Sequence, residues 1–172
     1  NAVNLTDGLD GLAVGLIIFV VGAYAGLSYL TGHAPLAQYL GIPYIPNSAE
    51  LTVVCMSVLG AGMGFLWYNA HPAEVFMGDT GSLSLGGSVG VISLLIKKEI
   101  LLVIIGGVFV AEVLTVIIQV VAFKLAGRRV FLMSPLHHHF ELKGWSESKI
   151  IVRFWIAGAM LALAALSTLK IQ

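Results

Sequence analysis

Long apolar stretches alternate with short polar segments along this chain. A helix needs about 20 residues to cross the hydrocarbon core of a bilayer, and five stretches reach or nearly reach that length. The sequence therefore predicts five membrane-spanning helices, at residues 12–30, 51–68, 83–96, 100–125 and 150–169. The third stretch is short and the fourth is long, and Gly106 and Gly107 mark an expected bend in the fourth. Helix is expected throughout, because lipid offers no hydrogen-bond partners to irregular backbone.

The composition agrees with this interpretation. The chain is 58% hydrophobic and only 10% charged, whereas soluble domains carry about 25% charged residues. Small residues recur within the apolar stretches, as at Gly22 and Gly26, and let membrane helices approach closely. We therefore expect an all-α polytopic membrane protein in which residues 1–172 form one integral-membrane domain. The formal net charge is zero, so the basic footprint of a nucleic-acid-binding protein is absent.

Basic residues predict the orientation of the chain in the membrane. Six of the nine Lys and Arg residues lie between positions 124 and 153, and the positive-inside rule places such a segment in the cytoplasm. Counting back across the predicted spans places residues 1–11, 69–81 and 126–149 on the cytoplasmic face. Each of these segments is rich in Asp, Asn or His. The sequence therefore predicts that their polar side chains form one site at that face.

The first polar segment reads N-L-T-D-G-L-D-G over residues 4–11. Capping of the helix that follows explains Asp10 by itself, but it does not explain Asn4, Asp7 and two glycines as well. Asp and Asn side chains suit the hydrogen-bonding edge of uracil, and glycine lets a ligand approach the backbone. Ligand binding and helix capping are equal alternatives for this segment.

The second polar segment carries Asp79 between two glycines, in an expected turn. Mg²⁺ binds through one or two carboxylates and completes its shell with water and substrate phosphates, so one well-placed Asp is enough for a metal–diphosphate site. The structural alternative is a turn residue that caps a helix beginning at Ser82. Phe76 offers a ring face to a planar base, or else anchors the chain at the membrane interface.

The third polar segment contains three successive histidines at residues 137–139. Three consecutive residues of a helix cannot all face one metal, and no second cluster supports a zinc site. Hydrogen bonding to phosphate by imidazole and a solvated loop are the alternatives, and chemistry alone favours the loop. Leu142 and Trp145, with nearby basic residues, suit an amphipathic segment lying on an anionic membrane surface.

Three polar residues share one face of the predicted fourth span, namely Glu112, Thr115 and Gln119. An acid near the centre of a membrane helix costs about 2.5–3.5 kcal/mol, so it should face the bundle or a wet cavity. We expect Glu112 to make an interhelical hydrogen bond. Gln119 lies nearer the cytoplasmic end and is expected to reach the site.

Together, three motifs resemble a known family. They are N-L-T-D-G-L-D-G at 4–11, N-A-H-P-A-x-x-F-M-G-D-T-G-S-L at 69–83 and P-L-H-H-H-F-E-L-K-G-W at 135–145. The chain is similar to the phospho-N-acetylmuramoyl-pentapeptide transferases, within the superfamily of polyprenyl-phosphate N-acetylhexosamine-1-phosphate transferases. The resemblance covers the whole chain in order, and its His-rich motif points to the muramoyl-pentapeptide branch.

The resemblance implies a multi-pass enzyme of the bacterial cytoplasmic membrane with its active site on the cytoplasmic face. The implied reaction transfers phospho-MurNAc-pentapeptide from UDP-MurNAc-pentapeptide to undecaprenyl phosphate, giving lipid I and UMP for peptidoglycan synthesis. It implies Mg²⁺ as cofactor, a homodimer as assembly, Asp79 as metal ligand and catalytic residue, and His137 as a second catalytic residue. The implied substrate-binding residues, with Phe76 stacking on the base, are Asn4, Asp7, Gly8, Leu9, Asp10, Asn69, Phe76, Gln119 and His138.

The sequence departs from the family in one respect. The family has about ten spans and a paired-aspartate motif, D-D-x-x-K, that this sequence lacks. The chain is therefore expected to be the C-terminal half of the enzyme, to be partnered by the N-terminal half and to be inactive alone. Three alternatives remain: a transferase of GlcNAc-1-phosphate to the same lipid, a transporter suggested by Glu112 and the broken fourth helix, and a structural subunit whose loops only cap helices.

Overall fold

The computed structural model describes residues 1–170, and within that range every regular element is a helix. The prediction of an all-α protein is confirmed. The elements are α1 (Ala2–Thr6), α2 (Leu12–Gly32), α3 (Ala34–Leu40), η1 (Ser48–Glu50), α4 (Leu51–Asn69), α5 (Gly78–Leu95), α6 (Glu99–Ile105), α7 (Gly107–Ala126), α8 (Leu136–Leu142), α9 (Glu147–Ser167) and η2 (Thr168–Lys170).

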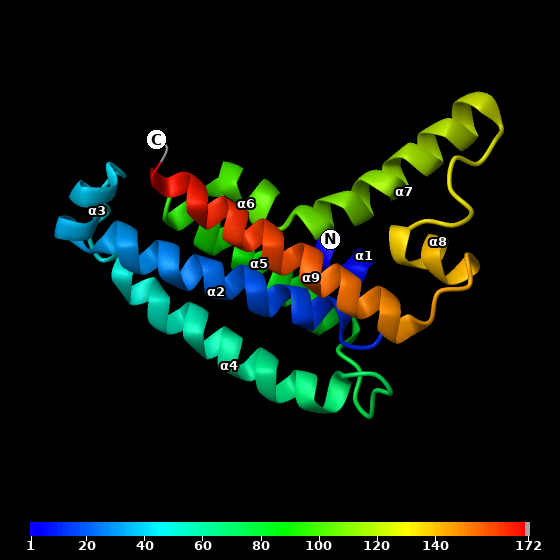
Figure 1. Ribbon diagram of the computed structural model, residues 1–172, viewed down its shortest axis with the longest axis horizontal. Coiled ribbons are helices and arrows are strands. Elements are labelled where there is room, and N and C mark those ends of the chain that lie inside the picture. The colour runs from blue at the N-terminus through cyan, green and yellow to red at the C-terminus, as the bar shows by residue number, and fades with distance from the viewer. Residues whose placement is uncertain (171–172) are drawn as a thin grey trace.

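Helix α2 is the centre of the bundle, lying between α4 and α9 (Figure 1). It is apolar on all sides, which is the pattern of a buried helix, and Leu12, Leu16 and Leu27 are almost completely buried. The contact with α9 is close because α2 has no side chain at Gly15, where a Cβ would lie 2.1 Å from Trp155 Nε1. Of the two glycines that the sequence singled out, Gly22 faces α4, where a Cβ would lie 3.4 Å from Leu59 Cδ1, whereas a Cβ at Gly26 would meet no atom within 4 Å.

Four of the described helical segments are long and apolar enough to cross a membrane, whereas the sequence predicted five spans. The four are Leu12–Gly32, Ser48–Asn69, Gly107–Ala126 and Glu147–Ser167. Helix α5 covers the expected third span but is not among them. Its 18 residues include five glycines and four serines, which make it less apolar than the others.

The expected fourth span is two helices and not one. The helix breaks at Gly106, where the sequence predicted a bend, so that α6 and α7 are separate. Helix α6 packs on α9, whereas α7 turns away from the bundle and extends beyond it (Figure 1). The outer part of α7 exposes large apolar side chains such as Phe123 and Leu125, as expected of a helix that faces lipid.

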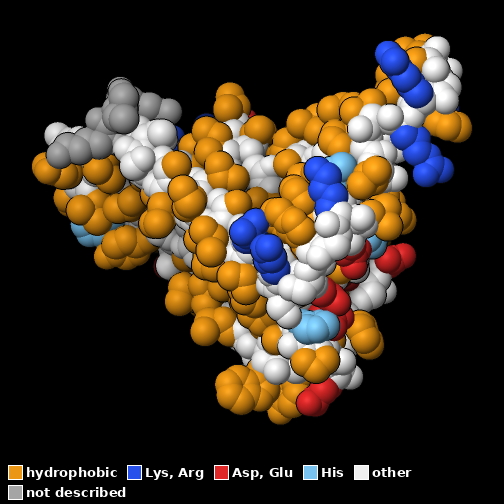
Figure 2. All heavy atoms as spheres, turned by 45° about the vertical axis from the view of Figure 1, so that its right-hand side comes forward, with side chains coloured by type: hydrophobic (Ala, Val, Ile, Leu, Met, Phe, Trp, Pro, Cys, Tyr) orange, Lys and Arg blue, Asp and Glu red, His pale blue; other side chains and the backbone are white. Residues whose placement is uncertain are grey.

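The polar segments gather at one end of the bundle. Helix α1, the loop between α4 and α5, and helix α8 all lie at the end opposite α3 (Figure 1). Figure 2 shows Lys, Arg, Asp, Glu and His side chains gathered toward this end, while the remaining visible surface is mostly hydrophobic.

The segment predicted to be amphipathic lies at the same end. Trp145 stacks on Phe140, with ring centroids 4.5 Å apart. Two cations from the first turns of α9 lie over its ring, Lys149 at 4.9 Å and Arg153 at 4.3 Å from the centroid. Leu142 is exposed, so this region presents apolar and cationic groups side by side, as a membrane-surface segment requires.

Candidate functional site

A polar cavity of about 270 Å³ lies where the first segment, the 69–78 loop and the start of α5 meet. It contains eight of the eleven residues that the sequence and the family resemblance marked as catalytic or substrate-binding. Met77 and Gly78 line it as well and were not predicted. The lining residues are Asn4, Asp7, Gly8, Leu9, Asp10, Asn69, Phe76, Met77, Gly78 and Asp79.

Asp79 lies in the first turn of α5, because that helix begins at Gly78. The expectation that Asp79 sits in a turn before a helix starting at Ser82 is therefore wrong. Gly78 has a positive φ of 66°, a conformation that glycine adopts without steric cost, and it lets the helix start earlier. A carboxylate in the first turn is favoured by the helix dipole. Asp79 Oδ1 accepts a hydrogen bond of 2.8 Å from Asn4 Nδ2, which fixes the carboxylate toward α1.

Asp7 ends α1 on the other side of the same cavity. Burial raises the pKa of the Asp7 carboxyl, and the nearby charge of Asp79 raises it further. Three of the lining residues in the described part of the chain are Asp and none is Lys or Arg. A cavity with this excess of negative charge favours a bound cation, and carboxylate oxygens are the ligands that Mg²⁺ prefers.

Asn69 joins the first segment to the loop that follows α4. Its side-chain oxygen accepts a hydrogen bond of 3.1 Å from the buried Gly11 N–H, and its Nδ2 donates one of 2.8 Å to the Val75 carbonyl. The residue is 4% exposed, so although it borders the cavity, most of its polar capacity is used to hold the two backbone segments together.

Replacing Asn69 with alanine is expected to destabilise the protein by about 1–3 kcal/mol, because the buried Gly11 N–H loses its acceptor. Thermal unfolding in detergent measures this effect. Ser84→Ala is the matched control, since Ser84 is exposed on α5 and its hydroxyl bonds only a carbonyl of its own helix. Equal melting temperatures for the two variants would contradict the bridging role.

Asp10 links the first segment to the loop and to α9. Its Oδ2 accepts a hydrogen bond of 3.0 Å from the Ala73 N–H and lies 3.2 Å from His71 Nδ1. Glu147 Oε2 lies 3.4 Å from the same His71 nitrogen, and Glu147 Oε1 accepts a hydrogen bond of 3.1 Å from the Asp10 N–H. The sequence did not predict a role for Glu147, because a pair separated by 137 positions leaves no local signal.

His137 lies behind the cavity wall. It is fully buried, and its Nδ1 lies 3.2 Å from Glu112 Oε1. Its Nε2 faces Gly8, where a Cβ would lie 2.4 Å from that nitrogen. His137 therefore contacts a residue that lines the cavity but does not line the cavity itself.

The other two histidines have separate surroundings. His138 Nδ1 pairs with Glu141, and His139 Nδ1 accepts a hydrogen bond of 3.1 Å from the Leu132 N–H. As expected, the three imidazoles do not face one point. His138, like His137, is not among the residues lining the polar cavity.

The structure does not bring Gln119 to the polar cavity. Its side-chain oxygen accepts hydrogen bonds from the N–H groups of Val130 and Phe131 at 3.0 and 2.9 Å, and its Nε2 donates to the Phe131 carbonyl at 3.1 Å. It lines a separate hollow of about 450 Å³ that also includes Lys124 and Arg129. The reason is the break at Gly106, which directs α7 away from the bundle.

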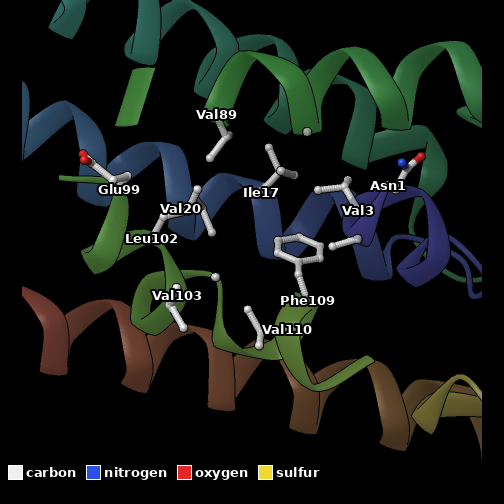
Figure 3. Close-up of a pocket in the computed structure, with 13 residues that line it drawn as sticks. Asn1, Val3, Ile17, Val20, Val89, Glu99, Leu102, Val103, Phe109 and Val110 are labelled. Atoms are coloured by element: carbon white, nitrogen blue, oxygen red, sulfur yellow. The ribbon is translucent and has the colours of Figure 1, made fainter. Parts of the chain in front are cut away.

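An apolar cavity of about 240 Å³ lies on the other side of α1. Val3, Ile17, Val20 and Phe109 point into it from α1, α2 and α7, as Figure 3 shows. Asn1 lies at one end. Since Val3 lines this cavity and Asn4 lines the polar one, α1 separates an apolar space from a polar space.

The sequence is similar to those of known proteins. Residues 1–97 match the family described as glycosyl transferase family 4. The chain is 62% identical over 173 residues to a phospho-N-acetylmuramoyl-pentapeptide-transferase of Solibacter usitatus (strain Ellin6076), covering 100% of this chain and 46% of the relative. It is 60% identical over 172 residues to the protein of that name from Koribacter versatilis (strain Ellin345), covering 100% of this chain and 45% of the relative. The chain spans about half the length of the curated relatives it matches.

Proposed function

From the fact that this chain belongs to glycosyl transferase family 4, we propose that it is the C-terminal half of an enzyme that transfers phospho-MurNAc-pentapeptide from UDP-MurNAc-pentapeptide to undecaprenyl phosphate. The products are lipid I and UMP. The relatives that match the whole chain carry the corresponding name. The single observation that carries the proposal is the polar cavity, which gathers three Asp, two Asn and an exposed aromatic ring at one end of a helical bundle.

The reaction is a phosphoryl transfer. An oxygen of the lipid phosphate attacks the β-phosphorus of the nucleotide sugar, a new P–O bond forms, and the bond from the β-phosphorus to the UMP oxygen breaks. Catalysis of such transfers rests mainly on positioning and on neutralising charge. The protein therefore has to bind the base and the diphosphate so that the β-phosphorus lies next to the attacking oxygen of the lipid phosphate.

Asp79 would hold Mg²⁺, and the ion would neutralise charge on the diphosphate when bound. The fit rests on the cavity's excess of carboxylates and on the raised pKa of Asp7 beside Asp79. Asn4 keeps the Asp79 carboxylate in place through its hydrogen bond of 2.8 Å. The Asp79 carboxylate is thus oriented before any ligand arrives.

The uridine would lie over Phe76, whose side chain is 73% exposed and borders the cavity. Stacking of a base on an aromatic ring contributes about 1–3 kcal/mol. The Asn4–Asp10 segment and Asn69 form the rest of the wall around the nucleotide. Gly8 and Leu9 are part of that segment and line the cavity, between the carboxylates of Asp7 and Asp10 in the sequence.

The lipid substrate would enter along the apolar cavity beside α1. An undecaprenyl chain needs apolar surface that ends close to the polar site, and α1 places Val3 and Asn4 on those two sides. The four membrane-crossing segments place the protein in a bilayer. We propose that this bilayer is a bacterial inner membrane and that the site faces the cytoplasm; the excess of Lys and Arg around α8 supports that orientation. An N-terminal half with the paired aspartates, and a homodimeric assembly, complete the proposed enzyme.

Reconstitution of the complete protein in lipid vesicles tests the proposal. We expect UMP release and lipid-linked product with UDP-MurNAc-pentapeptide, undecaprenyl phosphate and Mg²⁺, and neither after chelation of the metal. A higher kcat/KM with UDP-GlcNAc would overturn the donor and identify the enzyme as a GlcNAc-1-phosphate transferase. Solute flux across sealed vesicles without UMP release would identify a transporter instead.

A further inference from the structure

We propose that Asp10, His71 and Glu147 form a second cation site, which takes a divalent transition-metal ion such as Zn²⁺. The three side chains come from the first polar segment, from the loop after α4 and from the first residue of α9. One ligand atom of each lies within 4.8 Å of the others. The inference goes beyond the proposed function, because it assigns a metal to residues other than Asp79 and does not depend on the transfer reaction.

The distances from the imidazole to the two carboxylates match those around a tetrahedral metal ion. His71 Nδ1 lies 3.2 Å from Asp10 Oδ2 and 3.4 Å from Glu147 Oε2. Zn²⁺ binds imidazole nitrogen and carboxylate oxygen at about 2.0–2.2 Å, so neighbouring ligand atoms of a tetrahedral site lie roughly 3.3–3.5 Å apart. Both pairs therefore agree with such a site to within about 0.2 Å, the tolerance expected of a metal centre.

A proton on His71 explains this arrangement less well than a metal ion does. A hydrogen bond between imidazolium and carboxylate is about 2.7–2.9 Å long, and both of the observed distances are longer. One N–H also points at one acceptor, whereas Nδ1 faces two carboxylate oxygens at nearly equal distances. A cation shared by the three ligand atoms accounts for both features.

Backbone hydrogen bonds orient both carboxylates. Asp10 Oδ2 accepts a hydrogen bond of 3.0 Å from the Ala73 N–H, and Glu147 Oε1 accepts one of 3.1 Å from the Asp10 N–H. Glu147 Oε2 is therefore left to face the imidazole and the ion. Ligating carboxylates in metal sites are regularly held by such outer hydrogen bonds, so these two carboxylates are oriented before an ion arrives.

The ligand set selects a different ion from the one proposed at Asp79. Imidazole nitrogen suits Zn²⁺ and similar ions, whereas Mg²⁺ prefers oxygen ligands alone. The three side chains are 22–37% exposed, which gives an ion a path from solvent and leaves room for water as a fourth ligand. Asp10 also lines the polar cavity, whereas His71 and Glu147 do not, so the ion would tie the wall of that cavity to α9.

Equilibrium dialysis of the complete protein against Zn²⁺, without a histidine tag and with Mg²⁺ in excess, tests the proposal. We expect one Zn²⁺ to bind per chain. His71→Ala and Glu147→Gln should each weaken its binding at least about 10-fold, and the glutamine oxygen still accepts the Asp10 N–H. Glu74→Gln is the matched control, because it removes a charge from an exposed position in the same loop as His71. It should bind Zn²⁺ as the unmodified protein does, and so should Asp79→Asn.

X-ray absorption at the zinc edge of the unmodified protein identifies the ligands even if a variant does not fold. A shell of nitrogen and oxygen with one imidazole supports the proposal. A sulfur ligand would place the ion at Cys55, and two or more imidazoles would place it at the histidines of α8; either result overturns the inference. So does the absence of bound zinc, unchanged affinity in both His71→Ala and Glu147→Gln, or loss of zinc in Asp79→Asn. Absence of UMP release would contradict the proposed function alone.

Discussion

Asp79→Asn is expected to lower the rate of UMP release by the complete protein by at least about 10³-fold, because an amide cannot supply the charge that a magnesium–diphosphate complex requires. The fold should survive, since the asparagine oxygen still accepts the hydrogen bond from Asn4 Nδ2. Steady-state assays with increasing Mg²⁺ measure the effect. We expect the metal concentration for half-maximal activity to rise together with the loss in kcat.

Glu74→Gln is the matched control for Asp79→Asn. It removes the same charge five residues earlier, in the loop before α5, at an exposed position outside the cavity lining. Its rate and metal dependence should equal those of the unmodified protein. If Asp79→Asn retained more than about a tenth of the activity at ordinary Mg²⁺ concentrations, Asp79 would be only a helix-terminal residue of α5.

The helices of the bundle could be predicted from the sequence because lipid leaves few alternatives to a long apolar helix. The expected spans at 12–30 and 51–68 agree with α2 and α4 to within two residues at each end. A bend at Gly106 and Gly107 was also expected, although the helix breaks there into two. The length and start of helix α5 were harder to predict. Its glycines and serines make it less apolar than the other helices, and Gly78 lets it start within the motif at residues 69–83.

Much of the candidate site could be predicted because its residues lie in short motifs. Asn4, Asp7 and Asp79 line one cavity, as the motifs suggested. Contacts between distant segments left no such signal. Glu112 Oε1 lies 3.2 Å from His137 Nδ1, and the Gln119 side chain accepts hydrogen bonds from the N–H groups of residues 130 and 131. Both contacts depend on the direction that α7 takes after the break at Gly106. A residue pattern gives the face of a helix but not the path of the helix.

Asp7→Asn is expected to lower the rate of UMP release at least about 10²-fold, yet to leave the metal-free protein as stable or more stable at neutral pH. The opposite signs follow from the raised pKa of Asp7, which burial and then Asp79 cause. Above that raised pKa the carboxylate is ionised in both the folded and the unfolded chain, and only the folded chain carries the cost of burial and repulsion. Asparagine removes that cost.

The pH dependence distinguishes this explanation from simple damage to the fold. Below the ordinary pKa of 3.8, Asp7 is protonated in both states and its ionisation no longer costs the unmodified protein any stability. As the pH rises from there through the raised pKa of the folded state, ionised Asp7 destabilises the unmodified protein. Over this range the melting temperature of Asp7→Asn should therefore become higher than that of the unmodified protein. Thermal unfolding in chelator across this range measures the difference. A variant less stable than the unmodified protein at neutral pH would show that the Asp7 carboxylate stabilises the fold, and would remove the electrostatic argument for a cation beside Asp79.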